Sequence, residues 1–353
     1  MLFEGKRILI TGGTGSLGQI LTRRILGGEA GTPRKVIVLS RDEAKQHAMR
    51  LSYLHQAATT DEIIYQNFMR ALEFRIGDVR DYGDVCSAVR DADIVINAAA
   101  LKQVPTCEYF PEQAVLTNCV GPMNVVRAIR EHAYPVEVVV GVSTDKACKP
   151  VNVMGMTKAV QERIFVSANI LSPRTRFVCV RYGNVLASRG SVIPLFLEQI
   201  RNGGPVTVTV PEMSRFLLSL NHAVDIVFEA IRSARPGETL LPEAPAARVM
   251  DLARALVGDR PIEIRVTGIR PGEKLHEMLV SEEECHHTRR RSGYFAIASM
   301  LPELAGMDEG APLDRELSSA DALIGFADVL ALLRRHSLLV EQLSGPPTEE
   351  LLR

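Results

Sequence analysis

The fold class of this chain is decided near its start by the stretch Ile8-Leu9-Ile10-Thr11-Gly12-Gly13-Thr14-Gly15-Ser16-Leu17-Gly18. Its first four residues are apolar or β-branched and predict a buried strand. The glycines that follow have the spacing GxxGxxG and lead into a helical pattern. Glycine permits a tight turn and lets backbone N–H groups approach a pyrophosphate, which the N-terminus of the next helix also favours. The stretch therefore predicts a dinucleotide site made by Gly12, Thr14, Gly15, Ser16, Leu17 and Gly18.

Strand-like and helix-like segments alternate after this motif. Short β-branched runs predict strands at Ile8–Thr11, Lys35–Leu39, Glu73–Ile76, Ile94–Asn97, Val136–Val142 and Arg176–Arg181. Apolar residues at helical spacing predict helices at Leu17–Leu26, Asp42–His55, Gly83–Val89, Gly121–His132 and Thr157–Asn169. This alternation implies an α/β protein with a doubly wound, parallel Rossmann sheet. The connection Leu54–Leu72 is longer than such a link needs, so we expect a surface excursion at residues 55–72.

The length of 353 residues corresponds to two domains at about 150 residues each. After Tyr182 the pattern becomes irregular and rich in Gly and Pro. We expect a Rossmann domain over residues 1–182, to which a later segment at about 217–245 crosses back. A smaller α/β substrate-binding lobe would occupy residues 183–353. Apolar residues at helical spacing in Ser319–Leu343 predict a packing or subunit-contact helix.

Composition excludes several classes of function. Lys and Arg number 41 and Asp and Glu 42, a net charge of −1, whereas a dedicated binder of nucleic acid or acidic membranes is normally basic. No run approaches the roughly 18 apolar residues of a membrane span, and the first strand begins too early for a signal peptide. The six Cys are scattered, which is typical of reduced thiols in a cytoplasmic protein. We expect neither a nucleic-acid partner nor a membrane.

The end of the second expected strand discriminates between NAD and NADP. An acidic residue there would bind the ribose 2′-hydroxyl and repel a 2′-phosphate. This chain has Ser40-Arg41 instead, and a hydroxyl beside a guanidinium suits a phosphate. We therefore predict NADP, while Asp42 leaves NAD open.

Residues after the third and fourth expected strands extend the cofactor site. Asp78, followed by Val79, is placed to accept the adenine amino group, although it could instead cap a helix. Small residues after the fourth strand would let the nicotinamide half lie close to the backbone, namely Ala98, Ala99 and Ala100.

A reactive group of residues follows the fifth expected strand, Ser143-Thr144-Asp145-Lys146. Shortly after it, Met154-Gly155-Met156-Thr157-Lys158 opens a helix. Ligands bind at the carboxyl ends of strands in such sheets, so both segments are expected to face one.

Here the sequence resembles the extended short-chain dehydrogenase/reductase superfamily. It is more similar still to the UDP-N-acetylglucosamine 4,6-dehydratases of bacterial capsule and O-antigen pathways, in particular the soluble type that also inverts C5. The blocks that carry the resemblance are TGGTGSLG (11–18), SRDEAKQ (40–46), GDVRDY (77–82), NAAALKQVPTCEYFPEQAVLTN (97–118), STDKACKPVN (143–152), RYGNVLASRGSVIPLF (181–196) and GIRPGEKLHEMLVS (268–281). The tail and the 55–72 excursion are not covered.

One residue departs from the superfamily pattern. Its YxxxK motif would place Tyr at 154, where this chain has Met154, with Lys158 one helical turn further on. A thioether cannot accept a proton at neutral pH, which disfavours a Tyr-dependent alcohol dehydrogenase. Some members of the dehydratase family also carry Met here, so the departure fits the subgroup.

The resemblance implies a dehydration in which C4 is oxidised, the C5 proton and the C6 hydroxyl leave as water, and hydride returns to C6. We assign Asp145 as the acid and Lys146 as the C5 base. Asp145, through the Thr144 hydroxyl, would also take the C4 hydroxyl proton. Lys146 must be neutral part of the time, which we expect a desolvated, cationic neighbourhood near Lys158 to favour. Lys158 would bind the nicotinamide ribose.

The resemblance also implies residues that hold a UDP-sugar. Asn184 matches a position that meets the diphosphate, and the segment with Val192 and Leu195 one that packs on uracil. Arg215 and Arg270 match phosphate-binding arginines. Two more residues complete the expected set, Glu273 toward the uridine ribose and Lys102 toward the sugar.

Some features stay open at this point. Lys102 is alternatively a solvated lysine, and Cys107 is either an oxidation-sensitive thiol or a packing residue. Cys285-His286-His287 has no second ligand pair, so we expect no metal. The alternatives to a dehydratase are a UDP-sugar 4-epimerase, against which the Asp145-Lys146 pair argues, and a catalytically silent NADP-binding sensor. By resemblance we expect a homo-oligomer, either a dimer or a hexamer.

Overall fold

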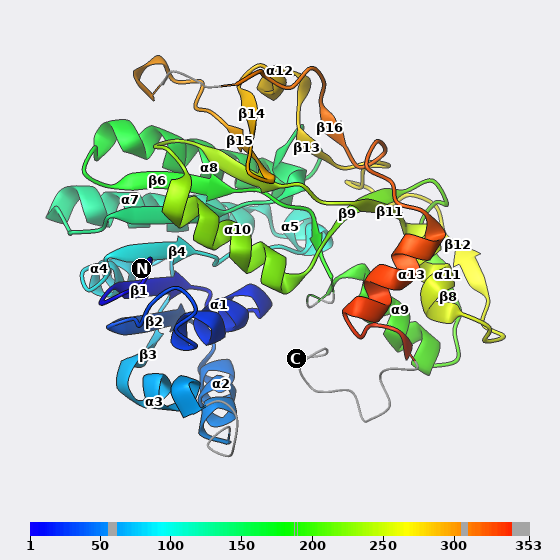
Figure 1. Ribbon diagram of the computed structural model, residues 1–353, viewed down its shortest axis with the longest axis horizontal. Coiled ribbons are helices and arrows are strands. Elements are labelled where there is room, and N and C mark those ends of the chain that lie inside the picture. The colour runs from blue at the N-terminus through cyan, green and yellow to red at the C-terminus, as the bar shows by residue number, and fades with distance from the viewer. Residues whose placement is uncertain (56–61, 187, 189, 305–309, 341–353) are drawn as a thin grey trace.

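A large twisted sheet organises the molecule (Figure 1). The computed structural model describes residues 1–55, 62–186, 188, 190–304 and 310–340. Nine strands lie in the order β14-β15-β10-β6-β5-β4-β1-β2-β3. The first six along the chain are parallel to their neighbours: β1 (Arg7–Thr11), β2 (Lys35–Ser40), β3 (Leu72–Ile76), β4 (Ile94–Asn97), β5 (Val138–Val142) and β6 (Arg176–Val180). The expected α/β fold with a doubly wound, mostly parallel sheet is confirmed.

Helices cover both faces of the sheet because successive side chains of a buried strand point to opposite sides. Ile8 and Ile10 pack under the helices α1 and α10, whereas Leu9 packs with α4, α7 and α8 on the other face. The helices of this half are α1 (Ser16–Leu26), α2 (Glu43–His55), α3 (Glu62–Ala71), α4 (Tyr82–Val89), α5 (Val104–Tyr109), α6 (Pro111–Val115), α7 (Gly121–His132) and α8 (Val153–Leu171). A π-helical turn, Leu116–Val120, joins α6 to α7.

A smaller lobe with its own core lies beside the carboxyl ends of these strands (Figure 1). Its strands form two small sheets, β11-β9-β7 and β12-β8. Its elements are β7 (Asn184–Val185), α9 (Val192–Arg201), β8 (Val206–Val208), β9 (Ser214–Leu218), β11 (Ala246–Arg248), α11 (Val249–Val257), β12 (Ile264–Val266) and α13 (Phe326–Arg335).

The chain crosses back to the large sheet after β9. There α10 (Leu220–Ser233) covers one face and β10 (Thr239–Pro242) pairs with β6. Strand β15 (Tyr294–Ile297) pairs antiparallel with β10, and β14 (Thr288–Arg291) pairs antiparallel with β15, although we expected residues 288–297 in the smaller lobe. The remaining elements are β13 (Met278–Val280), α12 (Glu282–Cys285), a 3-10 turn (Pro302–Leu304) and β16 (Leu317–Ser318).

Two expectations about local structure hold only in part. The surface excursion contains α3, whose Phe68 is buried and stacks on Tyr53 with ring centroids 5.3 Å apart. Residues 56–61 of that excursion lie outside the described residues. The tail is helical only in α13. Residues 319–325, before α13, are irregular, and among them Leu323 forms an isolated β-bridge with Ala246. Residues 341–343 of the predicted helix lie outside the described residues.

None of the helices within the described ranges combines the length and apolar character that crossing a bilayer requires.

Candidate active site

The glycine-rich turn after β1 is shaped by two close backbone contacts. Gly12 has φ +66°, and a Cβ there would lie 2.7 Å from the Cα of Ala99. A Cβ on Gly18 would overlap the backbone of Gly13. These contacts press the turn against the end of β4 and bring α1 onto the turn, so only glycine fits at both positions.

The N-terminus of α1 is built to receive an anion. Gly15 precedes the helix and gives no side-chain cap, and its first turn, which starts with Ser16 and the half-buried Leu17, contains no acidic residue. The first N–H groups of a helix have no partners within it and carry partial positive charge. The turn and the helix therefore fit a pyrophosphate, as the sequence predicts.

The end of β2 has the polarity that the sequence predicts. The Thr14 and Ser40 hydroxyl oxygens lie 2.8 Å apart. Arg41 is half-exposed, with Nη1 3.6 Å from Asp78 Oδ2. Asp42 accepts a hydrogen bond from the backbone N–H of Lys45 at 3.0 Å, so it caps the start of α2. The carboxylate that left NAD open is therefore engaged by its own helix.

Asp78 is not a helix cap. The cap of α4 is Asp81, whose Oδ1 accepts from Asp84 N at 2.9 Å. Asp78 instead accepts from Arg80 Nε at 2.8 Å, so it would meet an adenine while ion-paired. The carbonyl of the adjacent Val79 accepts from Asn124.

The end of β4 carries an unsatisfied donor. Thr11 Oγ1 donates to Asn97 Oδ1 at 2.9 Å and accepts from Ala99 N at 3.2 Å. The buried Asn97 Nδ2 has no hydrogen-bond partner. Buried polar groups are normally satisfied, so this donor is available to a ligand lying over Ala98, Ala99 and Ala100.

Asp145 lies in a 3-10 turn, Asp145–Ala147, that directly follows β5. Its side chain is fully buried. Oδ1 accepts from Thr144 Oγ1 and from Lys146 Nζ, both at 3.0 Å, whereas Oδ2 has no partner. Burial disfavours the ionised form and raises the pKa of Asp145. A carboxyl group that holds its proton more tightly suits the assigned role of acid.

The surroundings of Lys146 differ from the cationic neighbourhood that we expected. Its Nζ lies 3.0 Å from Asp145 Oδ1 and 3.1 Å from Glu277 Oε1. Burial alone would lower the pKa of Lys146, but the carboxylates of Asp145 and Glu277 outweigh it and raise that pKa. The ligand-free protein therefore keeps Lys146 charged, and the expectation of a neutral amine here is wrong.

Burial destabilises the charged form of Lys158. Its Nζ donates to the carbonyl of Val142 at 2.5 Å and to Gln161 Oε1 at 2.7 Å. Neither partner is charged, and burial lowers the pKa of Lys158 to about 8. The lysine of the expected cofactor site thus titrates near neutral pH.

Met154 and Cys107 pack together rather than face the reacting groups. Both are buried in a small apolar cluster with Ala114. Cys107 Sγ is 3.6 Å from the carbonyl of Leu101, and burial raises the pKa of its thiol to about 11. This makes Cys107 a packing residue, since the thiolate is the reactive form. Lys102 is exposed in the same loop.

The expected UDP-binding residues lie on several segments of the smaller lobe. Asn184 is in β7, and its buried Oδ1 has no hydrogen-bond partner. Val192 begins α9, and Leu195 lies one turn further along, partly exposed. Arg215 and Arg270 differ in setting: Arg215 is buried in β9, with Nη1 donating to the carbonyl of Ser214 at 2.7 Å.

A loop from the smaller lobe, residues 268–277, is hydrogen-bonded to residues that follow the 3-10 turn Asp145–Ala147, which is termed the catalytic turn. Arg270 is exposed in this loop, and its backbone N–H donates to Glu273 Oε2 at 3.3 Å. Lys274 Nζ donates to the carbonyl of Cys148 at 2.6 Å, and Asn152 Nδ2 to that of Gly272 at 2.7 Å. These two hydrogen bonds hold the loop that carries Arg270 and Glu273 against the segment that follows Asp145 and Lys146.

Sequence reasoning missed Glu277, which this loop places on Lys146. It also missed the buried ion pairs beneath the catalytic turn, where Arg181 contacts Glu162 at 2.6 Å and Glu284 at 2.7 Å. The Ser143 hydroxyl donates to Glu162 at 2.5 Å, which ties the turn to these pairs. Glu277 was visible only as an acidic residue inside the block 268–281.

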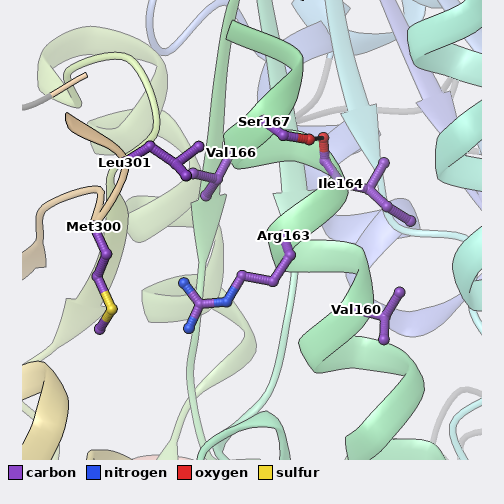
Figure 2. Close-up of a pocket in the computed structure, with 7 residues that line it drawn as sticks. All are labelled: Val160, Arg163, Ile164, Val166, Ser167, Met300 and Leu301. Atoms are coloured by element: carbon purple, nitrogen blue, oxygen red, sulfur yellow. Dashed lines mark hydrogen bonds between the residues drawn. The ribbon is translucent and has the colours of Figure 1, made fainter. Parts of the chain in front are cut away.

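Two cavities are lined by residues of α8 and by Met300. The larger, about 350 Å³, is mostly apolar, and Figure 2 shows the Arg163 side chain reaching across it toward Met300. The second, about 330 Å³, lies between α8 and α12 and reaches Cys148. Neither is lined by Asp145 or Lys146, so we do not assign them to the reaction.

The comparisons with known proteins agree with this architecture. The model of a family described as polysaccharide biosynthesis protein matches residues 8–299. The chain is 41% identical over 303 residues to a UDP-N-acetylglucosamine 4,6-dehydratase (inverting) of Campylobacter jejuni, covering 85% of each protein. It is equally similar to a UDP-glucose 4-epimerase of Rickettsia typhi, 41% identical over 301 residues and 84% of each protein. The crystal structure of Pen from Bacillus thuringiensis superposes with a TM-score of 0.86 at 34% identity, covering 96% of this chain and 100% of that one.

Proposed function

The chain belongs to the polysaccharide biosynthesis protein family of extended short-chain dehydrogenases/reductases, and from this membership we propose that it dehydrates a UDP-sugar to its 4-keto-6-deoxy form. The substrate we propose is UDP-N-acetylglucosamine, with inversion at C5, because a relative of this specificity matches over most of both chains. The proposal is carried by the buried Asp145, which pairs with the partly exposed Lys146 and whose Oδ2 has no partner in the protein.

NADP is the cofactor that we propose. The glycine turn and the N-terminus of α1 would hold its pyrophosphate, and Ser40 with Arg41 its 2′-phosphate. When bound, NADP would supply the acceptor for the hydride from C4 of the sugar and the donor for its return to C6. Asn97 Nδ2 offers the adjacent site a buried donor, and Lys158 holds the nicotinamide ribose.

The protein's own groups move the protons. Thr144 Oγ1 already donates to Asp145 Oδ1, so a C4 hydroxyl bound at Thr144 can pass its proton through it to Asp145. Asp145 then gives this proton to the departing C6 hydroxyl, which leaves as water. Lys146 takes the C5 proton as the C5–C6 double bond forms, and later returns a proton to C5. Before this step the partly exposed Lys146 amine must release its own proton to solvent, although Asp145 and Glu277 stabilise that proton.

A UDP-sugar 4-epimerase is the second candidate, because relatives with that name match as well as the dehydratase does. Epimerisation requires the C4 oxidation but neither an acid at C6 nor a base at C5. The placement of an acid with a raised pKa beside a lysine therefore favours dehydration.

One incubation separates the two candidates. The protein is mixed with NADP and UDP-N-acetylglucosamine or UDP-glucose in D2O and followed by NMR and mass spectrometry. We expect the mass to fall by one water and deuterium to appear at C5, with the C5 configuration reporting inversion. An unchanged mass with an inverted C4 would replace the dehydratase by an epimerase. No reaction with either sugar nucleotide would argue for a silent NADP-binding protein.

We also propose a homo-oligomer, a dimer or a hexamer. Large apolar side chains are exposed on α5 and α8, with Tyr109 82% and Val160 49% accessible. Exposed apolar surface of this kind commonly marks a subunit contact. Light scattering after size exclusion tests the proposal, and a monomeric mass at micromolar concentration would contradict it.

A further inference from the structure

Glu277 lies directly before β13 and carries a carboxylate into the catalytic centre from the C-terminal half of the chain. Its side chain is only 2% exposed. Oε1 is 3.1 Å from Lys146 Nζ and 3.8 Å from Arg215 Nε. Oε2 is 4.0 Å from Lys274 Nζ and has no hydrogen-bond partner. One carboxylate therefore faces three cations from three separate segments.

The backbone of Glu277 is fixed in place. Its N–H donates to Ser319 Oγ at 2.9 Å, and its carbonyl accepts from Ser319 N at 2.8 Å. The Ser319 hydroxyl also lies 2.7 Å from that of the buried Ser214, beside Arg215. Because both backbone groups of Glu277 are held in this way, its carboxylate is presented to Lys146 with little freedom to swing away.

The charges around this carboxylate act in one direction. Lys146, Arg215 and Lys274 face it and outweigh the effect of burial, so the pKa of Glu277 is lowered and the group is ionised. In turn Glu277 raises the pKa of Asp145, which burial raises most strongly. It also raises the pKa of Lys146, against burial and against the repulsion from Arg215. An ionised Glu277 thus favours the protonated form of each neighbour, that of Lys146 in the resting protein and that of Asp145 once it has taken up a proton.

We propose that Glu277 is a positioning residue that holds the Lys146 amine beside Asp145 and keeps it protonated in the resting protein. The proposal rests on the proposed function for its consequence in catalysis. Its electrostatic core is the effect of Glu277 on the protonation of Lys146, which is a property of the folded protein and is measurable without turnover.

Competitive acetylation tests that core. The full-length protein is labelled with trace acetic anhydride across a range of pH, and acetylation of Lys146 is quantified by mass spectrometry, with the exposed Lys149 as the internal reference. In Glu277→Gln, removal of one of two carboxylates at about 3 Å should lower the pKa of Lys146 by about one unit, so that it labels about tenfold faster at a fixed pH below that pKa. Lys149 should label as before.

Two further variants make the test specific. Glu277→Asp keeps the charge but withdraws it by one methylene, so labelling of Lys146 should fall between wild type and Glu277→Gln. Glu263→Gln is the matched control, because Glu263 is exposed and pairs with Arg265 at 2.9 Å, so Lys146 should label as in wild type. Unchanged labelling of Lys146 in folded Glu277→Gln overturns the proposal. If Glu277→Gln shows no thermal transition and is therefore unfolded, the test passes to Glu277→Asp. Labelling of Lys146 at the wild-type rate in that variant then overturns the proposal.

Turnover gives the catalytic readout. The limb of the kcat/KM pH profile that reports Lys146 should move to lower pH in Glu277→Gln by about the shift that labelling measures. If the pH profile stays in place while the labelling of Lys146 shifts, the rate does not depend on the protonation of Lys146. This result would refute the proposed consequence of Glu277 for catalysis. If wild type dehydrates no sugar nucleotide, the proposed function fails, and the labelling result still decides the role of Glu277 toward Lys146.

Discussion

Gly12 and Ala99 touch backbone to backbone, since a Cβ on Gly12 would lie 2.7 Å from the Ala99 Cα. We predict that Gly12→Ala weakens NADP binding at least tenfold and destabilises the fold, because the turn must move off the end of β4. Overpacking of this kind costs about 1–3 kcal/mol, in addition to about 1–2 kcal/mol for a left-handed backbone. Nucleotide titration and thermal unfolding measure the two effects.

Gly28→Ala is the matched control for this change. Gly28 also has a positive φ, +73°, but a Cβ there would have no other atom within 4 Å. It should lose stability through backbone strain alone and bind nucleotide like wild type. Equal nucleotide affinity in both variants would show that the contact with Ala99 does not shape the binding site.

Asp145→Asn should lower turnover by about 10²–10⁴-fold, because an amide cannot donate the proton that the C6 hydroxyl requires. Its binding of nucleotide should be unchanged, since the glycine turn is untouched. Single-turnover product formation and nucleotide titration check the two halves. Asp259→Asn, at an exposed position, should match wild type in both. Near-normal turnover in Asp145→Asn would sink the assignment of the acid.

Met154→Tyr restores the superfamily tyrosine but should not create a tyrosine-dependent dehydrogenase. Met154 is 5% exposed and packs against Cys107 and Ala114, so a larger side chain with a buried hydroxyl should cost about 1–3 kcal/mol of stability. Met156→Tyr, 48% exposed, should unfold like wild type. An increased rate of alcohol oxidation in Met154→Tyr would contradict this prediction.

The lowered pKa of Lys158 makes the stability of the fold depend on pH, with a defined sign. Its folded pKa, about 8, lies below the value of about 10.4 for an unfolded lysine, so the unfolded chain binds more protons between these values and wild-type stability rises with pH there. Lys158→Met should remove this rise. Relative to wild type, the variant should be more stable at pH 7 than at pH 10 by roughly 2–3 kcal/mol. The free energy of unfolding of both proteins, measured by urea or thermal unfolding across this pH range, checks the prediction. An identical pH dependence in the two proteins would disprove the lowered pKa of Lys158.

We predict that Arg41 discriminates NADP from NAD. Arg41→Ala should weaken NADP binding by about tenfold or more and leave NAD binding nearly unchanged, because only NADP presents a 2′-phosphate to the guanidinium. Arg34 is exposed just before the opposite end of β2, and Arg34→Ala should affect neither nucleotide. Equal losses for NADP and NAD would assign Arg41 a role other than discrimination.

Much of the large sheet follows from local pattern. Buried parallel strands read as β-branched runs, and the six expected strands coincide with β1 to β6 within one or two residues at each end. The helix α3 could also have been predicted, since Ile64, Phe68 and Ala71 lie on one helical face. The length of a connection alone does not reveal such a helix.

The electrostatics of the site could not be predicted in this way. The pairing of Lys146 with Glu277 joins a turn after β5 to a residue before β13, and only the folded chain brings them together. The same holds for Arg181 and Glu284. The assignment of Asp145, Lys146 and Lys158 as site residues is a prediction from the sequence motifs, whereas the protonation of Asp145 and Lys146 depends on a partner far along the chain.

The far half of the chain completes the large sheet, and this has a consequence for biosynthesis. Residues Thr239 and Leu240 of β10 cover the edge of β6, and β15 and β14 follow outward. A ribosome that adds about 5–20 residues per second releases β6 on the order of ten seconds before Ile297. During that interval the nascent chain carries an open strand edge, which is a site for wrong pairing. The large sheet therefore obtains all nine of its strands only after more than a hundred residues beyond β6 have been made.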